Sequence, residues 1–212
     1  MLCSRKTPSA CLTSAMRKLT HGSGAMGGTS MSANVSVDIE TGGLNKRAAI
    51  VSIGAVRFDM ATGHVTDTFY RTVRIASCLA FGMETDADTM RWWNEQTESA
   101  RAVLNCPDAV SIETALKDFA AFIGDSCTGL WGNGPAFDNA ILDEAYRLTG
   151  IRQPVHFRLD RCVRTIVALA CSLGTDPKAL VPANKGAHHA LNDALYQAEL
   201  VSKSYQIITQ RN

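Results

Sequence analysis

The sequence lacks the features that mark several classes of protein. None of its seven cysteines forms a Cys-x-x-Cys pair and their number is odd, which favours reduced thiols in a cytoplasmic protein. No apolar run approaches the roughly 20 residues that span a bilayer, so no membrane contact is expected. Neither sign of charge predominates, with 21 Lys and Arg against 20 Asp and Glu. The overall field therefore does not by itself hold a long nucleic acid.

The first 30 residues contain no acid, no hydrophobic periodicity and no long apolar core. We expect residues 1–30 to be a disordered extension. The missing apolar core argues against a secretory signal, whereas the basic, serine-rich composition fits a transit peptide. We prefer the hypothesis of a mis-assigned start, with Met31 as the true first residue; an engineered leader is the other alternative. Removal of residues 1–30 is then expected to leave activity unchanged.

Residues 31–212 show neither an internal repeat nor a linker, and they predict one domain. β-branched residues predict three strands in an antiparallel meander, and amphipathic helices then alternate with shorter strands. This order favours an α/β fold with a mixed five-stranded sheet flanked by helices. Asp160 is expected to cap a helix. The predicted strands are 34–40, 48–59, 65–73, 128–133 and 154–159, and the predicted helices are 87–105, 112–124, 137–150, 161–174 and 190–208.

Two acids interrupt the first predicted strand. Asp38 and Glu40 are two residues apart, so both side chains leave the same face of the strand. Buried together they would repel each other, unless a cation lay between them. Hard divalent ions such as Mg²⁺ prefer oxygen ligands of this kind. A solvated strand end is the commoner interpretation of an isolated Asp-x-Glu.

Two later segments carry further acids. Asp138 lies where a loop enters a helix, a place where the helix dipole alone favours an acid. His188 precedes the last predicted helix and Asp193 lies in its first turn, so the histidine can lean over a site that Asp193 faces. For His188 or His189 alone, a solvent-facing residue near a helix start is the commoner interpretation.

Together these segments resemble the DEDDh family of 3′-5′ exonucleases, which have a ribonuclease H-like fold. That family carries Asp-x-Glu on the first strand, an Asp in an Asn-x-x-x-Phe-Asp segment, and His-x₄-Asp at the last helix. By position, the resemblance implies His188 as the general base and four metal ligands. His189 is one residue out of this spacing, and the related DEDDy class is excluded because it requires a tyrosine there. The implied ligands are Asp38, Glu40, Asp138 and Asp193.

The resemblance spans nearly all of residues 34–200. Within the family, the sequence is similar to a subgroup that contains bacterial exoribonuclease-like proteins and phage DNA exonucleases. This similarity implies a bacterial or phage-encoded protein. This narrower resemblance rests on the segments DIETGG, AAIVSIGAVRFD, TMRWWNEQ, WGNGPAFDNAIL and DRCVRT. One departure is Gly42, where other DEDDh enzymes often have a second threonine, and it is expected to alter how the terminal nucleotide is gripped.

The resemblance implies hydrolysis of phosphodiester bonds at the 3′ ends of single-stranded DNA or RNA, with two Mg²⁺ or Mn²⁺ ions. Two ions about 3.5–4 Å apart can serve both the attacking and the leaving oxygen. Asp38 would bridge the ions and Glu40 would orient the water. His188 would take a proton from that water, a role that suits an imidazole side chain.

Contacts with the substrate are harder to predict. The backbone around Thr41 and the side chain of Leu44 are expected to meet the terminal nucleotide, as the resemblance implies. Phe137 is expected near a sugar or base, with core packing an equally good interpretation. Lys185 is the electrostatic candidate for a phosphate. Trp92 and Trp93 are adjacent on a helix; core packing is the simpler interpretation of both, and stacking of one on a base is the alternative.

Two other functions stay open at this point. A nucleic-acid-binding protein that has lost catalysis would be expected to lack a carboxylate, and none is missing. A ribonuclease H-like endonuclease shares the fold, but the His-x₄-Asp element argues against it. A homodimer also stays open, as does the choice between RNA and DNA, which proteins distinguish through the 2′-hydroxyl.

Overall fold

The computed structural model describes residues 33–184 and 188–210, which belong to the unit Met31–Asn212. The predictions for residues 1–30 and for Lys185 lie outside the described residues. Within the described ranges, no helix is both long enough and apolar enough to cross a membrane. The described cysteines are free thiols, and three of them, Cys78, Cys106 and Cys127, are buried.

The centre of the fold is a five-stranded mixed sheet, as the sequence predicts, and its strand order is β3-β2-β1-β4-β5. Strands β1 (Ala33–Thr41), β2 (Ile50–Phe58) and β3 (Val65–Thr72) form the antiparallel meander. Strand β4 (Cys127–Gly132) pairs with β1 in parallel, and β5 (Asp160–Cys162) pairs with β4 in parallel. Strand β1 is therefore the central strand.

The helices begin and end largely where local sequence signals place them. Ser111 caps α4 by accepting a hydrogen bond from Thr114 N, and Gly150 ends α5 in the left-handed conformation with φ 68°. The prediction for residues 87–105 corresponds to α2, α3 and η1, whereas α1 was not predicted. The helices are α1 (Ile75–Ala80), α2 (Ala87–Glu95), α3 (Glu98–Arg101), η1 (Ala102–Asn105), α4 (Ile112–Ile123), α5 (Asp138–Thr149), η2 (Phe157–Leu159), α6 (Val163–Ser172), η3 (Pro177–Ala179) and α7 (Ala190–Thr209).

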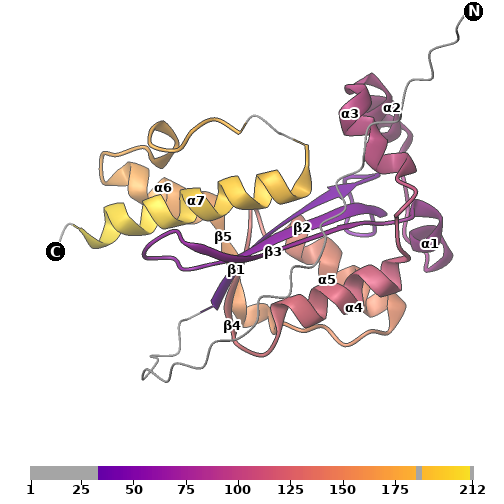
Figure 1. Cartoon of the computed structure of the whole chain (residues 1–212), viewed down its shortest axis with the longest axis horizontal. Coiled ribbons are helices and arrows are strands. Elements are labelled where there is room, and N and C mark those ends of the chain that lie inside the picture. The colour runs from indigo at the N-terminus through magenta and orange to yellow at the C-terminus, as the bar shows by residue number, and fades with distance from the viewer. Residues whose placement is uncertain (1–32, 185–187, 211–212) are drawn as a thin grey trace, which may run out of the picture. The chain divides into compact units, whose positions relative to one another are not determined.

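Helices cover both faces of the sheet. Helices α4 and α5 lie on one face, and the long helix α7 lies on the other, next to α6 (Figure 1). Because side chains alternate along a strand, β1 sends Val35, Val37 and Ile39 into the core on the α4 and α5 side. Burial of each such side chain contributes about 1.5–3 kcal/mol. The intervening residues Asp38 and Glu40 are thereby held on the face that α7 covers.

Two predictions for the segment after α5 are wrong. Residues 154–159 are not a strand, because this segment ends in the 3₁₀ turn η2, where His156 Nδ1 accepts a hydrogen bond from Arg158 N at 3.2 Å. The strand β5 begins only after this turn. Asp160 does not cap α6, whose N-cap is Cys162. The Oδ1 of Asp160 instead accepts a hydrogen bond from Asn139 Nδ2 at 2.8 Å.

Candidate active site

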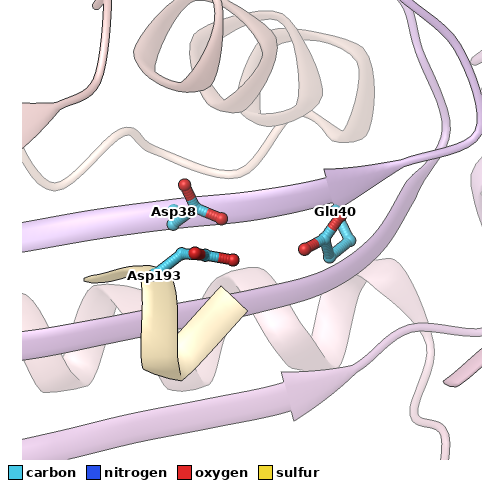
Figure 2. A group of neighbouring side chains, drawn as sticks. All are labelled: Asp38, Glu40 and Asp193. Carbon is cyan, nitrogen blue, oxygen red and sulfur yellow. The ribbon is translucent and has the colours of Figure 1, made fainter. Parts of the chain in front are cut away.

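Three carboxylates converge on the α7 face of the sheet. Asp38, Glu40 and Asp193 each offer one oxygen, and these oxygens lie within 4.8 Å of one another. Figure 2 shows the carboxyl groups of β1 and α7 turned toward one another. The period-two alternation of β1 aligns the first two acids, and the first turn of α7 supplies the third. The sequence predicted this convergence of residues that are more than 150 positions apart.

A glycine in β2 brings Asp193 close to the sheet. Gly54 pairs with Asp38 in the register of β1 and β2. A Cβ atom at Gly54 would lie 2.2 Å from the carbonyl carbon of Ala190 and from Leu191 N, in the first turn of α7. The backbone of α7 thus packs directly on the backbone of β2, and only glycine permits this approach. This contact holds Asp193 beside Asp38.

Asp138 adjoins the three-carboxylate cluster from a second helix, α5. It is the first residue of α5 and is 4% exposed. Its Oδ1 accepts a hydrogen bond from Ile39 N at 3.3 Å, which attaches the start of α5 to β1 between the two strand acids. Its charge repels those of Asp38 and Glu40. All four predicted ligands therefore gather in one region, with Asp138 outside the closest group of three.

Burial and mutual repulsion raise the pKa values of these acids. Burial, followed by repulsion from Asp138, Asp193 and Glu40, raises the pKa of Asp38 well above its usual value. Burial and the charges of Asp193 and Asp138 raise the pKa of Glu40 to about 8. Burial raises the pKa of Asp138 to about 6 and also raises that of Asp193. The ionised forms of these four carboxylates are unfavourable without a positive charge beside them. Divalent cations such as Mg²⁺ or Mn²⁺, which prefer oxygen ligands, would supply that charge.

Gln197 is a buried partner of the cluster that the sequence analysis missed. Its Nε2 donates a hydrogen bond to Asp38 Oδ1 at 2.7 Å, and the residue is 3% exposed. Gln197 lies four residues after Asp193 on α7, so both side chains project from the same side of the helix. This spacing was the available sequence signal. The bond holds one oxygen of Asp38 and favours its ionised form.

His188 lies beside the cluster on the segment that leads into α7. Its backbone N–H donates a hydrogen bond to Asp193 Oδ2 at 3.0 Å. Its φ of 66° lies in the left-handed region, where a non-glycine residue is uncommon. The imidazole ring packs edge-on against Trp92, with ring centroids 4.9 Å apart. The neighbouring His189 instead stacks on Tyr70, with centroids 4.5 Å apart.

A pocket of about 740 Å³ opens beside Glu40. Thr41 is buried at its base and donates its hydroxyl to the Gly43 carbonyl oxygen at 2.7 Å. Leu44 is 75% exposed at its edge. Phe137 lines the pocket and also packs against the core, so its core packing is confirmed and its contact with a sugar or base stays a prediction. The full lining comprises Ile39, Glu40, Thr41, Leu44, Asp86, Ala87, Asp88, Thr89, Trp92, Trp93 and Phe137.

The two adjacent tryptophans of α2 have different surroundings. Trp93 is 1% exposed, and its Nε1 donates a hydrogen bond to the Thr41 carbonyl oxygen at 2.9 Å. Trp92 is 37% exposed and lines the pocket. Core packing is therefore correct for Trp93, whereas Trp92 presents an aromatic surface to the pocket. A pocket with an apolar rim beside clustered carboxylates suits a sugar–base unit whose phosphate lies near bound cations.

Solved structures share this fold at low sequence identity. Cell-death related nuclease 4 gives a TM-score of 0.60 at 12% identity, over 81% of this chain and 63% of that chain. Exonuclease I gives a TM-score of 0.61 at 13% identity, over 85% of this chain and 41% of that chain. The nuclease domain of 3′hExo, a DEDDh family member bound to rAMP, gives a TM-score of 0.55 at 13% identity, over 84% of this chain and 94% of that chain. The predicted ribonuclease H-like fold is thus confirmed, and the chain spans less than two thirds of the first two proteins.

A search of curated protein sequences gives no match. The profile of the family described as 3′-5′ exoribonuclease Rv2179c-like domain, however, matches residues 33–205. This match covers most of the chain and includes the acids of β1, the start of α5 and the start of α7. The chain therefore belongs to the 3′-5′ exoribonuclease Rv2179c-like domain family.

Proposed function

We propose that the protein removes nucleotides one at a time from the 3′ ends of single-stranded nucleic acid, with RNA as the preferred substrate. The observation that carries this proposal is the pocket that opens directly beside Glu40 of the carboxylate cluster. A terminal nucleotide in this pocket would place its phosphate next to the acids. The preference for RNA is supported by the description of the family, which names an exoribonuclease.

The four acids Asp38, Glu40, Asp138 and Asp193 would hold two divalent ions, Mg²⁺ or Mn²⁺. When bound, such ions polarise the phosphodiester and make water more acidic. The acids themselves fix the positions where cations can bind, because two stand on one face of β1 and the others start α5 and α7. Asp38 lies centrally among them, which suits a ligand shared by both ions.

His188 would act as the general base. Water attacks phosphorus as His188 takes one of its protons, the bond from phosphorus to the 3′ oxygen breaks, and that oxygen gains a proton from solvent. The products are a nucleoside 5′-monophosphate and a strand shortened by one residue with a new 3′-hydroxyl. The bond from the His188 N–H to Asp193 keeps this residue beside the cluster. Its ring, which lies against Trp92, would turn toward the water when a substrate occupies the pocket.

The pocket residues would select and orient the terminal nucleotide. Leu44 and Trp92 offer exposed apolar surface for a base, and Phe137 offers a further aromatic contact. Thr41 stabilises the start of the adjoining loop through its bond to Gly43. Lys185, outside the described residues, remains the proposed contact for a phosphate near His188. None of these contacts requires a particular base, which is consistent with trimming of varied sequences.

The direct test uses 5′-labelled single-stranded RNA and DNA of one sequence, with Mg²⁺, Mn²⁺ or EDTA. We expect a ladder that shortens from the 3′ end, faster on RNA, and no reaction in EDTA. Asp38→Ala and His188→Ala are each expected to abolish the ladder while the protein stays folded. A circular single strand separates the endonuclease alternative, because only an endonuclease cuts it. Tight binding without a ladder would instead support a catalytically inactive binding protein.

A further inference from the structure

One side chain joins two walls of the pocket. The carboxylate of Asp86 accepts hydrogen bonds from Thr89 N at 2.6 Å and from the Thr89 hydroxyl at 2.8 Å, and it thereby caps α2. Its Oδ2 also accepts a hydrogen bond from Leu44 N, in the loop after β1, at 3.2 Å. The N–H of Asp86 donates to the Gly42 carbonyl oxygen at 2.9 Å. Asp86 is thus bonded both to the helix that carries Trp92 and to the loop that carries Leu44.

The loop packs tightly against the segment before α2. A Cβ atom at Gly42 would lie 2.8 Å from Thr85 Cγ2, and one at Gly43 would lie 3.1 Å from Asp86 Oδ2. A larger residue at position 42 would push the loop and the helix start apart. The glycine at this position, which the sequence analysis noted as a departure, therefore has a physical reason in this contact.

Other bonds attach α2 and the loop after β1 to the rest of the fold. The Asp86 carboxylate fixes the exposed edge where the loop meets α2. The buried indole of Trp93 attaches the inner side of α2 to Thr41. Arg47, near the end of the loop, forms an ion pair with Glu144 of α5 at 3.2 Å. Between these anchors, Leu44 is 75% exposed. Its N–H bond to the Asp86 carboxylate is a polar contact between this part of the loop and α2.

We propose that Asp86 is a positioning residue that sets the separation of Leu44 and Trp92, and so the fit of the pocket to the terminal base of the substrate. This inference rests on the proposed function, since it assigns the pocket to a nucleotide. Asp86 acts through its two neighbours and not on the reacting atoms. Loss of its bond to Leu44 would release the part of the loop around Leu44, while the backbone bond from the Asp86 N–H to Gly42 still holds the start of the loop. Substrate would then bind more weakly while the carboxylates and His188 keep their arrangement.

Three variants of Asp86 separate its two roles. Asp86→Ser keeps a residue that caps helices well but is too short to reach Leu44 N. It is expected to raise KM for a short 5′-labelled RNA about tenfold, the scale of one or two hydrogen bonds to a charged group. A change in KM alone marks lost binding, so kcat should stay within about twofold. Asp86→Asn keeps the length but only one acceptor oxygen, which can serve either Thr89 N or Leu44 N, so its KM should lie between the wild-type and Asp86→Ser values. Asp86→Ala should lose the cap as well and unfold at a lower temperature.

Two comparisons make the test specific. Asp88→Ala removes the same charge from the same wall without touching the loop, and it should lower KM because the substrate is a polyanion. In a double-mutant cycle, Leu44→Ala should raise KM much less in the Asp86→Ser background than in wild type, because the leucine is already misplaced. A wild-type KM in Asp86→Ser, additive effects in the cycle, or an equal rise in KM in Asp88→Ala would overturn the inference. If wild-type protein degrades no oligonucleotide, the proposed function itself has failed.

Discussion

Replacement of Gly54 by alanine is expected to separate the carboxylate cluster within an otherwise intact fold. The new methyl group would lie 2.2 Å from backbone atoms of Ala190 and Leu191, whereas ordinary contact begins at 3.4 Å. The first turn of α7 must therefore retreat by about 1.2 Å, the difference of these distances, because backbone cannot rotate away. That shift is a quarter of the 4.8 Å within which the oxygens of Asp38, Glu40 and Asp193 lie.

A displacement of about 1 Å in a catalytic constellation can cost roughly a hundredfold in rate. We expect a loss of this size in exonuclease activity, and a loss of about 10- to 100-fold in Mn²⁺ affinity measured by isothermal titration calorimetry. Overpacking should also cost about 1–3 kcal/mol of stability. In a chain of this size that lowers the melting temperature by about 2–4 °C for each kcal/mol, so the protein stays folded at 25 °C.

Gly63→Ala is the matched control for this prediction. Gly63 has a φ of 76°, and a Cβ atom there would lie 2.9 Å from Ser202 Oγ, far along α7 from Asp193. This change should destabilise the fold by a comparable amount and leave Mn²⁺ affinity unaltered. Wild-type Mn²⁺ affinity in folded Gly54→Ala would refute the reasoning, because the close contact between β2 and α7 would then not position Asp193.

Further predictions concern the acids, their buried partner and the pocket. Because the pKa of Glu40 is raised to about 8 from 4.5, the metal-free folded protein holds its proton more tightly than the unfolded chain does, so the free energy of unfolding should fall as pH rises from about 5 to 8. Urea denaturation in EDTA checks this, and the decline should be smaller in Glu40→Gln and at saturating Mn²⁺. Gln197→Leu should weaken Mn²⁺ binding about tenfold through lost support of Asp38, whereas Gln206→Leu, on the same helix, should not; equal affinities in both variants would contradict this role. Trp92→Ala should weaken the binding of RNA by about 1–3 kcal/mol, the free energy of the lost stacking, and so raise KM. An unchanged KM would place the base elsewhere.

Much of the site could be predicted because several of its residues are close together in the sequence, at spacings that place them on one face of a strand or at the start of one helix. Asp38 and Glu40 share a face through the two-residue period of a strand, and His188 and Asp193 are placed by the start of one helix. The mixed five-stranded sheet followed from the order of strands and helices, whereas the central position of β1 in it was not predicted. Asp138 was harder to place, because a first-turn acid is common without any function.

The rest depends on contacts that local sequence does not encode. The segment 154–159 alternates apolar and polar residues like a strand and buries Val155 in the core, yet its backbone turns, and pairing with β4 begins only at Asp160. The spacing of Gln197 from Asp193 indicates only a shared helix face, and its bond to Asp38 depends on how α7 packs over β1. Asp86 looks like an ordinary helix cap, and its bond to Leu44 links positions 42 residues apart. Tertiary packing decides all three cases.

The measurement that tests the central claim most directly is anomalous diffraction from crystals soaked in Mn²⁺. We expect manganese peaks within coordination distance of the Asp38 carboxylate, with Glu40, Asp138 and Asp193 completing the ligand set. Peaks only at other surfaces, or none at a Mn²⁺ concentration that supports full exonuclease activity, would contradict it.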